Sequence, residues 1–399
     1  MRFLILTQYF PPEVGAPQVR LQAMSRELRA QGHEVRVVTA MPNYPRGEVF
    51  PAYRGRVVVH EDADGVQVTR TWIYPASGRG VVKRVASYWS FTLSALLGTL
   101  RGPGPDFIFV ESPPLFLGLT AWLTGVLRGR PYIFNVSDLW PESAVSLGIV
   151  TNRTLIALAE RLERFCYRHA FRVSAVTEGI RDAIAAVPGS APVIVFPNGV
   201  DVDTFRHAEG ASIAGLQADG AAIFVFAGTH GYAQGLDIIV DAAGRLRDRR
   251  DIRFVLVGDG PDKTRIQDLA RDLPNIAFLD PVPLSSMPAI FSASRASIVP
   301  LRKLDLFKSA RPSKILPSLS CETPVIYAGE GETVTLIEAN DCGIAVAPEC
   351  GEQLAAAVVR LADDGALARR MGANGRALVT GSYSWSAIVR RWLQEIGVA

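Results

Sequence analysis

MRFLILTQYFPPEVGAPQVRLQAMSRELRAQGHEVRVVT, residues 1–39, predicts a strand, a loop, a helix and a second strand in that order. Apolar residues dominate 3–7 and 34–39, whereas the period over 19–29 is that of a helix. Parallel strands need a crossover connection, which is usually a helix. The opening therefore predicts an α/β domain built on a parallel sheet.

The same alternation continues along the chain and then starts again. Further strands of the first series are predicted at 107–110, 132–135, 172–176 and 193–196. A second series follows Asn198-Gly-Val-Asp201, with strands predicted at 223–226, 253–257, 276–279, 296–299, 324–327 and 343–346. Doubly wound sheets of this kind bind ligands at the carboxyl ends of their strands.

We therefore expect an α/β protein with two Rossmann-like, doubly wound domains that face each other across a cleft. The first domain is expected to span residues 1–196 and the second residues 197–384. A final helical segment, residues 385–399, is expected to cross back to the first domain.

Composition and charge exclude several classes of protein. The chain has 399 residues, of which 48% are hydrophobic and 20% charged, so it is neither disordered nor fibrous. The net charge is only +3 and no groove-reading motif is present, which argues against nucleic-acid binding. The four cysteines lack metal-site spacing, and no signal-peptide cleavage site follows the first strand. We expect a cytoplasmic protein.

In the first half, loops that follow predicted strands carry the candidate site residues. Gly15 and Ala16 are small enough to let a ligand approach the next helix, in a loop that also holds Glu13. The loop is not GxGxxG, which argues against a dinucleotide-dependent redox enzyme. Asp138 and Glu142 follow another strand, where a carboxylate can deprotonate a hydroxyl or stabilise a positive centre. An N-cap is the alternative role for Asp138.

In the second half, glycine-rich loops and cations suggest an anion site. Gly228, Thr229 and Gln234 follow a strand, and backbone N–H groups in such a loop can bind a diphosphate. The basic residues between 300 and 314 could neutralise a leaving diphosphate, or form a solvated or lipid-facing surface. They are Arg302, Lys303, Lys308, Arg311 and Lys314.

Two apolar stretches are candidates for contact with a membrane. Arg79, Lys83 and Arg84 precede an apolar run at 88–97, and a second run occupies 113–127. Neither reaches the roughly 20 residues that span a bilayer, but a basic helix with aromatic residues can lie in the membrane interface. Burial against the first sheet is the alternative for both runs. We keep residues 79–97 as a candidate contact with the inner membrane surface.

Together these motifs resemble those of the GT-B-fold family 4 glycosyltransferases, in particular the bacterial branch of O-antigen and capsule assembly. The resemblance covers nearly the whole chain and rests on the order and spacing of the motifs. They are Phe10-Pro-Pro-Glu-Val-Gly-Ala16, Asp138-Leu-Trp-Pro-Glu142, Pro197-Asn-Gly-Val-Asp201, Ala233-Gln-Gly-Leu-Asp237, Gly258-Asp-Gly-Pro261 and Pro312-Ser-Lys314. The resemblance implies a retaining, metal-independent sugar transfer without a cofactor, with the nucleotide sugar in the C-terminal domain and the acceptor in the N-terminal domain.

The resemblance also implies roles for single residues. Asp138 and Glu142 would serve the reacting centre, and Glu13, Gly15 and Ala16 would lie on the acceptor side. The residues that would contact the donor are Asn198, Gly228, Thr229, Gln234, Gly258, Asp259, Gly260, Arg302, Lys308, Ser313, Lys314, Glu330 and Glu332. In that set Arg302 and Lys314 would offset the charge of the diphosphate.

Two departures from the family pattern matter. Thr229 and Gln234 stand where the glycine-rich loop usually has Arg and Lys. Ser309 and Pro317 stand where the family has a pair of glutamates seven residues apart. The set Glu322, Glu330 and Glu338 keeps the spacing but lies after the expected helix start. Glu330 and Glu332 are the candidates to replace the missing pair.

We therefore expect a UDP-sugar-dependent glycosyltransferase of the hexosyl or N-acetylhexosaminyl type. The expected donor sugar is an N-acetylated or deoxy-amino hexose, and the expected acceptor is a polyprenyl-diphosphate-linked saccharide. Two alternatives remain open. A UDP-sugar epimerase of the same fold would need no acceptor, and a degenerate nucleotide-sugar-binding or scaffold protein would explain Ser309 and Pro317.

Overall fold

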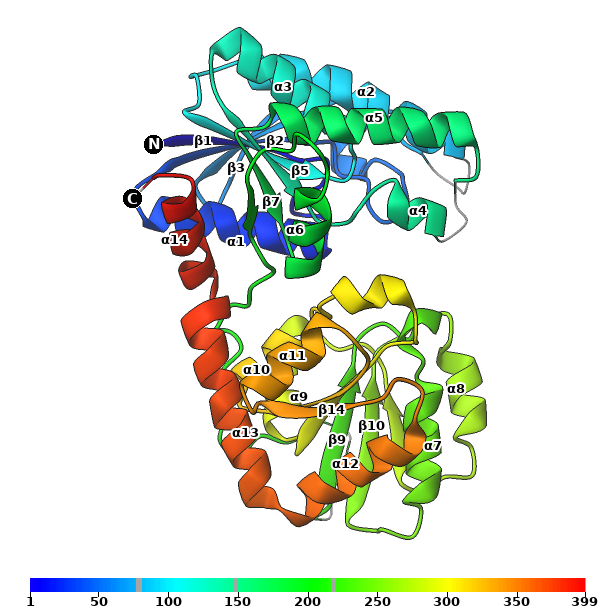
Figure 1. Ribbon diagram of the computed structural model, residues 1–399. Coiled ribbons are helices and arrows are strands. Elements are labelled where there is room, and N and C mark those ends of the chain that lie inside the picture. Colours follow the sequence, from blue (N-terminus) through cyan, green and yellow to red (C-terminus); the bar gives the residue numbers. More distant parts are fainter. Residues whose placement is uncertain (77–80, 147–149, 215, 217–219, 399) are drawn as a thin grey trace. The chain divides into compact units, whose positions relative to one another are not determined.

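The computed structural model describes residues 1–76, 81–146, 150–214, 216 and 220–398. The chain divides into two compact units. Unit 1 comprises residues 1–198 and the C-terminal segment that starts at Ile388, and unit 2 comprises residues 199–387. Each unit is a sheet of mostly or wholly parallel strands with helices on its faces (Figure 1).

Within the described residues, the sheet of unit 1 has the strand order β3-β4-β2-β1-β5-β6-β7-β8. Neighbouring strands are parallel except β3 and β4, which pair antiparallel at one edge. The strands are β1 (Arg2–Leu6), β2 (Glu34–Ala40), β3 (Val58–Ala63), β4 (Val66–Thr71), β5 (Phe107–Ser112), β6 (Tyr132–Val136), β7 (Arg172–Ala175) and β8 (Val193–Val195). The predicted strands of the first half therefore exist, and β3 and β4 are additions.

The helices of unit 1 follow from right-handed crossovers. Strand β2 lies on one side of β1, and strands β5 to β8 follow one another on the other side. With right-handed crossovers, the helices that connect the two sets of strands lie on opposite faces of the sheet. One face is covered by α2 (Val81–Leu100), α3 (Leu117–Arg128) and α5 (Arg153–His169), and the other by α1 (Ala16–Ala30) (Figure 1). The remaining helical segments are η1 (Pro51–Tyr53), α4 (Glu142–Ser146) and α6 (Glu178–Ala185).

The C-terminal segment is anchored in unit 1 by one tryptophan. Helix α14 (Trp385–Glu395) begins in unit 2, and its residues from Ile388 onward belong to unit 1. Trp392 is fully buried, with its ring 5.7 Å from that of Phe109 and 5.6 Å from that of Phe196. Its indole N–H donates to the hydroxyl of Ser174 (3.2 Å). Such an aromatic cluster contributes both buried area and ring contacts, so it fixes this segment on the sheet.

Unit 2 contains a fully parallel sheet in the order β11-β10-β9-β12-β13-β14 among the described residues. Its strands are β9 (Ala222–Ala227), β10 (Ile252–Val257), β11 (Ile276–Leu279), β12 (Ala296–Pro300), β13 (Val325–Ala328) and β14 (Gly343–Val346). The predicted strands of the second half are thus confirmed within a residue or two. The four inner strands are buried, near-continuous apolar runs, as expected when both faces of a sheet are covered, whereas the edge strands β11 and β14 are partly exposed.

Two hydrophobic clusters form the core of unit 2, one on each face of the sheet. The first contains α7 (Asp237–Arg245), α8 (Lys263–Leu269) and α12 (Gly351–Asp363), and the second contains α9 (Met287–Ser292), α10 (Ile315–Ser320) and α11 (Glu332–Ala339). Helix α13 (Gly365–Leu378) contributes to both clusters. The short segments are η2 (Tyr232–Gln234), η3 (Leu284–Ser286), η4 (Asp305–Ser309) and the π-helical η5 (Val379–Tyr383).

No helix among the described residues is long and apolar enough to span a membrane. Helix α2 is the longest in unit 1 and contains most of the predicted apolar run. Arg79, the first residue of the predicted membrane contact at 79–97, lies outside the described residues.

Candidate functional site

The loops after β9 and β10 in unit 2 meet backbone to backbone. Gly258 (φ +138°) and Gly260 (φ +158°) take conformations that L side chains rarely adopt. A Cβ on Gly258 would overlap the carbonyl oxygen of Gly228, and one on Gly260 would overlap the backbone of His230. The N–H of His230 donates to the carbonyl of Asp259 (2.8 Å), which ties the two loops together. We call residues 228–230 and 258–260 the glycine platform.

Lys314 lies directly beside the glycine platform. Its Nζ is 4.1 Å from the ring centroid of Phe226, at the end of β9. Burial lowers the pKa of this ammonium from 10.5 to about 8. Among the described residues it has no carboxylate partner. A half-buried cation without a counter-charge is costly, so the site is suited to an anionic group of a ligand.

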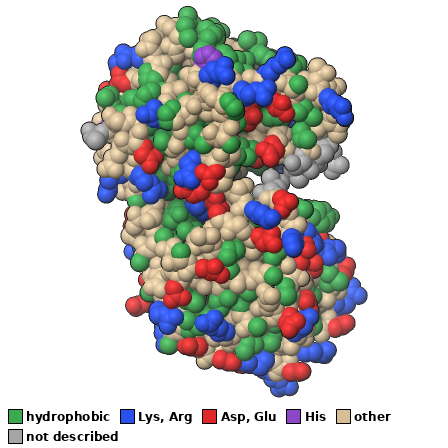
Figure 2. Space-filling view, viewed as in Figure 1, with side chains coloured by type: hydrophobic (Ala, Val, Ile, Leu, Met, Phe, Trp, Pro, Cys, Tyr) green, Lys and Arg blue, Asp and Glu red, His purple; other side chains and the backbone are tan. Residues whose placement is uncertain are grey.

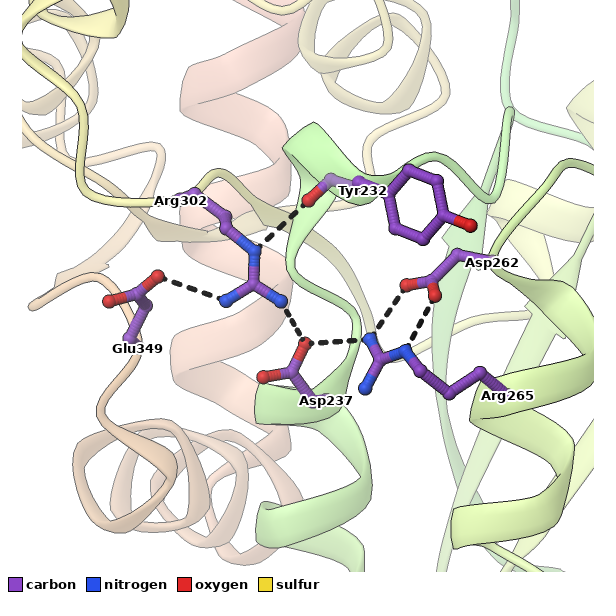
Figure 3. A network of polar contacts seen from close by, with 6 residues as sticks. All are labelled: Tyr232, Asp237, Asp262, Arg265, Arg302 and Glu349. Atoms are coloured by element: carbon purple, nitrogen blue, oxygen red, sulfur yellow. Dashed lines mark hydrogen bonds and ion pairs between the residues drawn. The ribbon is translucent and has the colours of Figure 1, made fainter.

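Arg302 is held by the protein itself (Figure 3). Its Nε donates to the carbonyl of Tyr232 (3.1 Å), its Nη2 contacts Asp237 (2.8 Å), and its Nη1 contacts Glu349 (3.1 Å). Asp237 is also contacted by Arg265 (3.3 Å), whose guanidinium binds Asp262 through two bonds. Arg302 therefore braces the loop between β9 and α7. These three contacts leave two N–H groups of the Arg302 guanidinium without a hydrogen bond among the described residues, one on each Nη atom.

His230 is fully buried, with its ring 5.6 Å from that of Phe226. A lone histidine in a loop is either a ligand contact or, more often, a solvated surface residue, and the burial of His230 contradicts the second interpretation. Burial and the nearby Lys263 lower its pKa, so the ring is neutral at pH 7. Neither ring nitrogen has a hydrogen-bond partner among the described residues. Unpaired buried nitrogens carry a free-energy cost that a ligand hydrogen bond would remove.

The other predicted donor contacts of unit 2 lie on the platform, in η2, in the 300–314 segment and at the start of α11. Thr229 is exposed on the platform, Gln234 is half-buried in η2, and Ser313 is exposed next to Lys314. Lys308 is exposed and contacts Asp305 (2.7 Å) and, more weakly, Glu330 (3.8 Å). Glu332 starts α11 and pairs with Arg311 (3.0 Å), both largely buried. Glu330 and Glu332 are thus already engaged by cations of the 300–314 segment.

Ser309 ends η4 and Pro317 lies within α10. Neither position offers a carboxylate, so the glutamate pair of the family has no counterpart at these positions. The last predicted donor contact, Asn198, belongs to unit 1, where its side chain accepts a hydrogen bond from Arg20 (2.6 Å).

In unit 1, Asp138 follows β6 and is exposed. Its carboxylate accepts a hydrogen bond from the hydroxyl of Ser143 (2.8 Å), not from a backbone N–H of α4. Glu142, the first residue of α4, is also exposed. A carboxylate at a strand end, held by one hydroxyl and open to solvent, can orient or deprotonate an acceptor hydroxyl.

A buried charged network supports this loop and was missed in the sequence. Arg20 and Glu111 are almost fully buried and form an ion pair, and both contact the hydroxyl of Ser137. Asn135 donates to the other oxygen of Glu111 (2.8 Å). The network fixes the backbone one residue before Asp138. The signal was present, since Glu111 interrupts an apolar strand, where an unpaired carboxylate would be very costly.

Glu13 is a brace between two loops of unit 1. It is 3% exposed, and its carboxylate accepts from the backbone N–H groups of Asn43 (2.8 Å), Tyr44 (2.8 Å) and Phe10 (3.3 Å). Burial raises its pKa, against the opposing effect of these three donors. Both oxygens are occupied, so Glu13 holds these two loops together from within.

Gly15 and Ala16 begin α1. Gly15 has an extended backbone and precedes the helix, and a Cβ there would crowd the Gln18 side chain.

Among the described residues, no group of three or more His, Cys, Asp or Glu side chains is placed to hold a metal ion.

Each unit matches the model of a known protein family. Residues 15–199 match the family model of the glycosyl transferase 4-like domain, and residues 221–364 match that of the glycosyl transferases group 1. The chain is 28% identical over 349 residues to the putative colanic acid biosynthesis glycosyl transferase WcaI of Escherichia coli K12, covering 84% of each chain. It is 26% identical over 367 residues to the 2-deoxystreptamine glucosyltransferase of Streptomyces kanamyceticus, covering 87% of this chain and 89% of that one.

Solved structures agree on the fold. Sucrose-phosphate synthase from Thermosynechococcus elongatus superposes with a TM-score of 0.75 at 19% identity, over 99% of this chain and 98% of that chain. HepE from Anabaena, solved in complex with UDP, superposes with a TM-score of 0.74 at 15% identity over the whole of both chains. The two matched domains together span most of the sequence, one in each unit. The chain therefore belongs to the GT-B-fold glycosyltransferases that join a 4-like domain to a group 1 domain.

Proposed function

We propose that this glycosyltransferase takes its sugar from a UDP-sugar bound on the glycine platform of unit 2. The observation that carries the proposal is Lys314, a half-buried cation without a carboxylate partner among the described residues, beside a platform that only glycine can form. Solved relatives of the fold support the choice of nucleotide, because HepE was crystallised with UDP and with UDP-glucose. A UDP leaving group develops negative charge, which the Lys314 ammonium and backbone N–H groups stabilise.

The transfer itself proceeds with retention of configuration and without a metal, as in the family that the motifs resemble. Asp138 faces the reacting centre and orients the acceptor hydroxyl, since it is a strand-end carboxylate held only by Ser143. Glu142, the first residue of α4, lies four residues further along the chain. With Ser309 and Pro317 in place of the glutamate pair, Lys314 and the platform provide the main charge stabilisation at the leaving group.

The donor sugar is an N-acetylated or deoxy-amino hexose, and the acceptor is a polyprenyl-diphosphate-linked saccharide in surface polysaccharide assembly. The similarity to WcaI, whose name places it in colanic acid biosynthesis, supports a polysaccharide product. Unit 1 holds the acceptor, because it contains the strand-end loops with Glu13 and Asp138.

A membrane contact through α2 accompanies this acceptor. Trp89, Leu93 and Leu97 follow each other at helical spacing and are 40%, 64% and 60% exposed. Lys83 and Arg84 are exposed at the start of the same helix. Hydrophobic side chains are visible along the upper margin of unit 1, over α2 and α3 (Figure 2). An apolar face with cations at one end suits an anionic bilayer surface.

The test is a transfer assay with a set of UDP-sugars and lipid extracts that contain polyprenyl-diphosphate saccharides. Formation of an extended lipid-linked saccharide, with the anomeric configuration of the donor, is the expected result. Turnover of a UDP-sugar to a new UDP-sugar without acceptor would instead indicate an epimerase. Tight UDP binding without turnover under any condition would indicate a scaffold protein, the alternative that Ser309 and Pro317 favour.

A further inference from the structure

Two neighbouring cavities of unit 1 differ sharply in character. The first, of about 310 Å³, lies at the carboxyl ends of β1 and β2 and is lined by polar, aromatic and cationic side chains. The second, of about 460 Å³, is lined mostly by apolar surface. Both are bounded by the segments 41–49 and 72–76, and they share Gly47. We call them the head cavity and the chain cavity.

The head cavity is built to bind a polar, anionic group. Its wall includes Tyr9 and Tyr44, whose rings meet edge to face at 5.6 Å, together with Tyr88. Arg46 and Arg84 line it as exposed cations, and neither forms an ion pair among the described residues. Exposed guanidinium groups near a cluster of tyrosines are well suited to phosphate oxygens and sugar rings.

Gln8 provides an independent indication of a ligand in the head cavity. It is 2% exposed and lines the cavity, with its Nε2 donating to the hydroxyl of Tyr9 (3.1 Å). Its Oε1 is buried and has no partner among the described residues. A ligand hydroxyl would satisfy this oxygen. Glu13 holds the wall in place, because its carboxylate binds the backbone N–H groups of Asn43 and Tyr44.

Among the described residues, the chain cavity has no buried polar side-chain atom without a partner that would correspond to Gln8 Oε1. Trp72 and Val57, at 44% and 68% exposure, leave large apolar surface open to solvent there, and the half-buried Tyr53 and the buried Ile73 also line the cavity. Charged side chains stand in its wall as well, namely Glu48, Arg54 and Arg56. Open apolar surface next to a cationic cavity matches a ligand that is apolar at one end and anionic at the other.

We infer that the two cavities form one acceptor site, in which the head cavity binds the diphosphate and first sugar of the acceptor and the chain cavity binds the start of its isoprenoid chain. The inference rests on the proposed function, which makes unit 1 the acceptor side. Helix α2 contributes Arg84 and Tyr88 to the head cavity and also carries the exposed Trp89, Leu93 and Leu97. The acceptor can therefore pass from a bilayer surface into the site along one helix.

Farnesyl diphosphate is a suitable probe, with inorganic pyrophosphate and UDP titrated into the same protein samples by calorimetry. The double variant Arg46→Gln/Arg84→Gln should weaken farnesyl diphosphate binding about tenfold or more, because it removes two charge-assisted contacts. Trp72→Ser should weaken farnesyl diphosphate binding while leaving pyrophosphate binding unchanged. The matched controls are Arg26→Gln and Leu155→Ser, which alter exposed residues outside both cavities and should bind the probe as the wild type does.

The inference is overturned if the wild type binds farnesyl diphosphate no better than pyrophosphate, or if the cavity variants behave like their controls. UDP binding in the same samples distinguishes failure of the acceptor site from failure of the proposed UDP-sugar donor. Retained UDP binding with no farnesyl diphosphate binding refutes the acceptor site alone, whereas absence of UDP binding in the wild type refutes the proposed donor.

Discussion

Replacing Lys314 by Met should stabilise unit 2 and at the same time weaken UDP binding. Burial holds the pKa of Lys314 at about 8 instead of 10.5, so keeping it charged in the folded protein costs about 3 kcal/mol. The contact with the Phe226 ring offsets ~1 kcal/mol of that cost. Methionine has a similar length and no charge. We therefore expect the free energy of unfolding at pH 7 to rise by about 2 kcal/mol in the variant, measured by urea denaturation.

The pH dependence of stability independently tests whether the charged Lys314 destabilises the folded protein. Because the folded-state pKa is lowered, the folded protein binds fewer protons than the unfolded chain between about pH 8 and 10.5. Over this window the wild type should gain stability relative to Lys314→Met as pH rises. The difference between the two proteins should therefore shrink toward zero near pH 10.5.

UDP binding should take up a proton at Lys314. A diphosphate beside the ammonium restores its charged form, so about half a proton should be absorbed per UDP at pH 8 and about a tenth at pH 7. Calorimetry in phosphate and in Tris, whose ionisation enthalpies differ, measures this number directly. Lys314→Arg is the matched control, since it keeps a charge that does not titrate. Unchanged UDP affinity in Lys314→Met, or lower stability of that variant, would refute the reasoning.

Four other substitutions, the first with a matched glycine control, test the remaining parts of the structure. Gly258→Ala should abolish UDP binding or destabilise unit 2 by more than about 2 kcal/mol, whereas Gly381→Ala, with open space at its Cβ, should stay within about 0.5 kcal/mol of the wild type in urea denaturation. Arg302→Gln should weaken UDP binding about tenfold in calorimetry by loosening the β9–α7 loop; wild-type affinity would show that the brace is dispensable. Asp138→Asn should lower kcat about a hundredfold with UDP affinity intact, and equal loss of both would contradict the assigned role. The wild type should sediment with anionic liposomes at low salt and Leu93→Asp should do so less; a wild type that ignores the liposomes would contradict the membrane contact.

Strand positions could be predicted because each buried strand is a short apolar run between loops. The edge pair β3 and β4 escaped prediction, because its sequence contains exposed polar residues such as His60 and Gln67. A local signal did exist at the turn. Asp64 and Gly65 both have positive φ, the combination that Asp-Gly favours in tight hairpins.

Residue types at the site could be predicted, but their partners could not. The sequence places Arg302, Asp237 and Glu349 far apart, and only folding shows that they bind one another. Burial was equally hidden. His230 lies in a glycine-rich loop that looks solvated, and Glu13 lies in a loop that looks open to a ligand, yet both are enclosed by backbone from other segments. Tertiary contacts of this kind depend on loops that meet only at the carboxyl ends of the strands.

Calorimetric titration of the full chain with UDP, GDP, ADP and dTDP, each with and without EDTA, tests the proposed donor site most directly. We predict that UDP binds selectively, that EDTA leaves its affinity unchanged, and that Gly258→Ala loses the binding. Binding of none of the four nucleotides, or wild-type UDP affinity in Gly258→Ala, would contradict a donor site on the glycine platform.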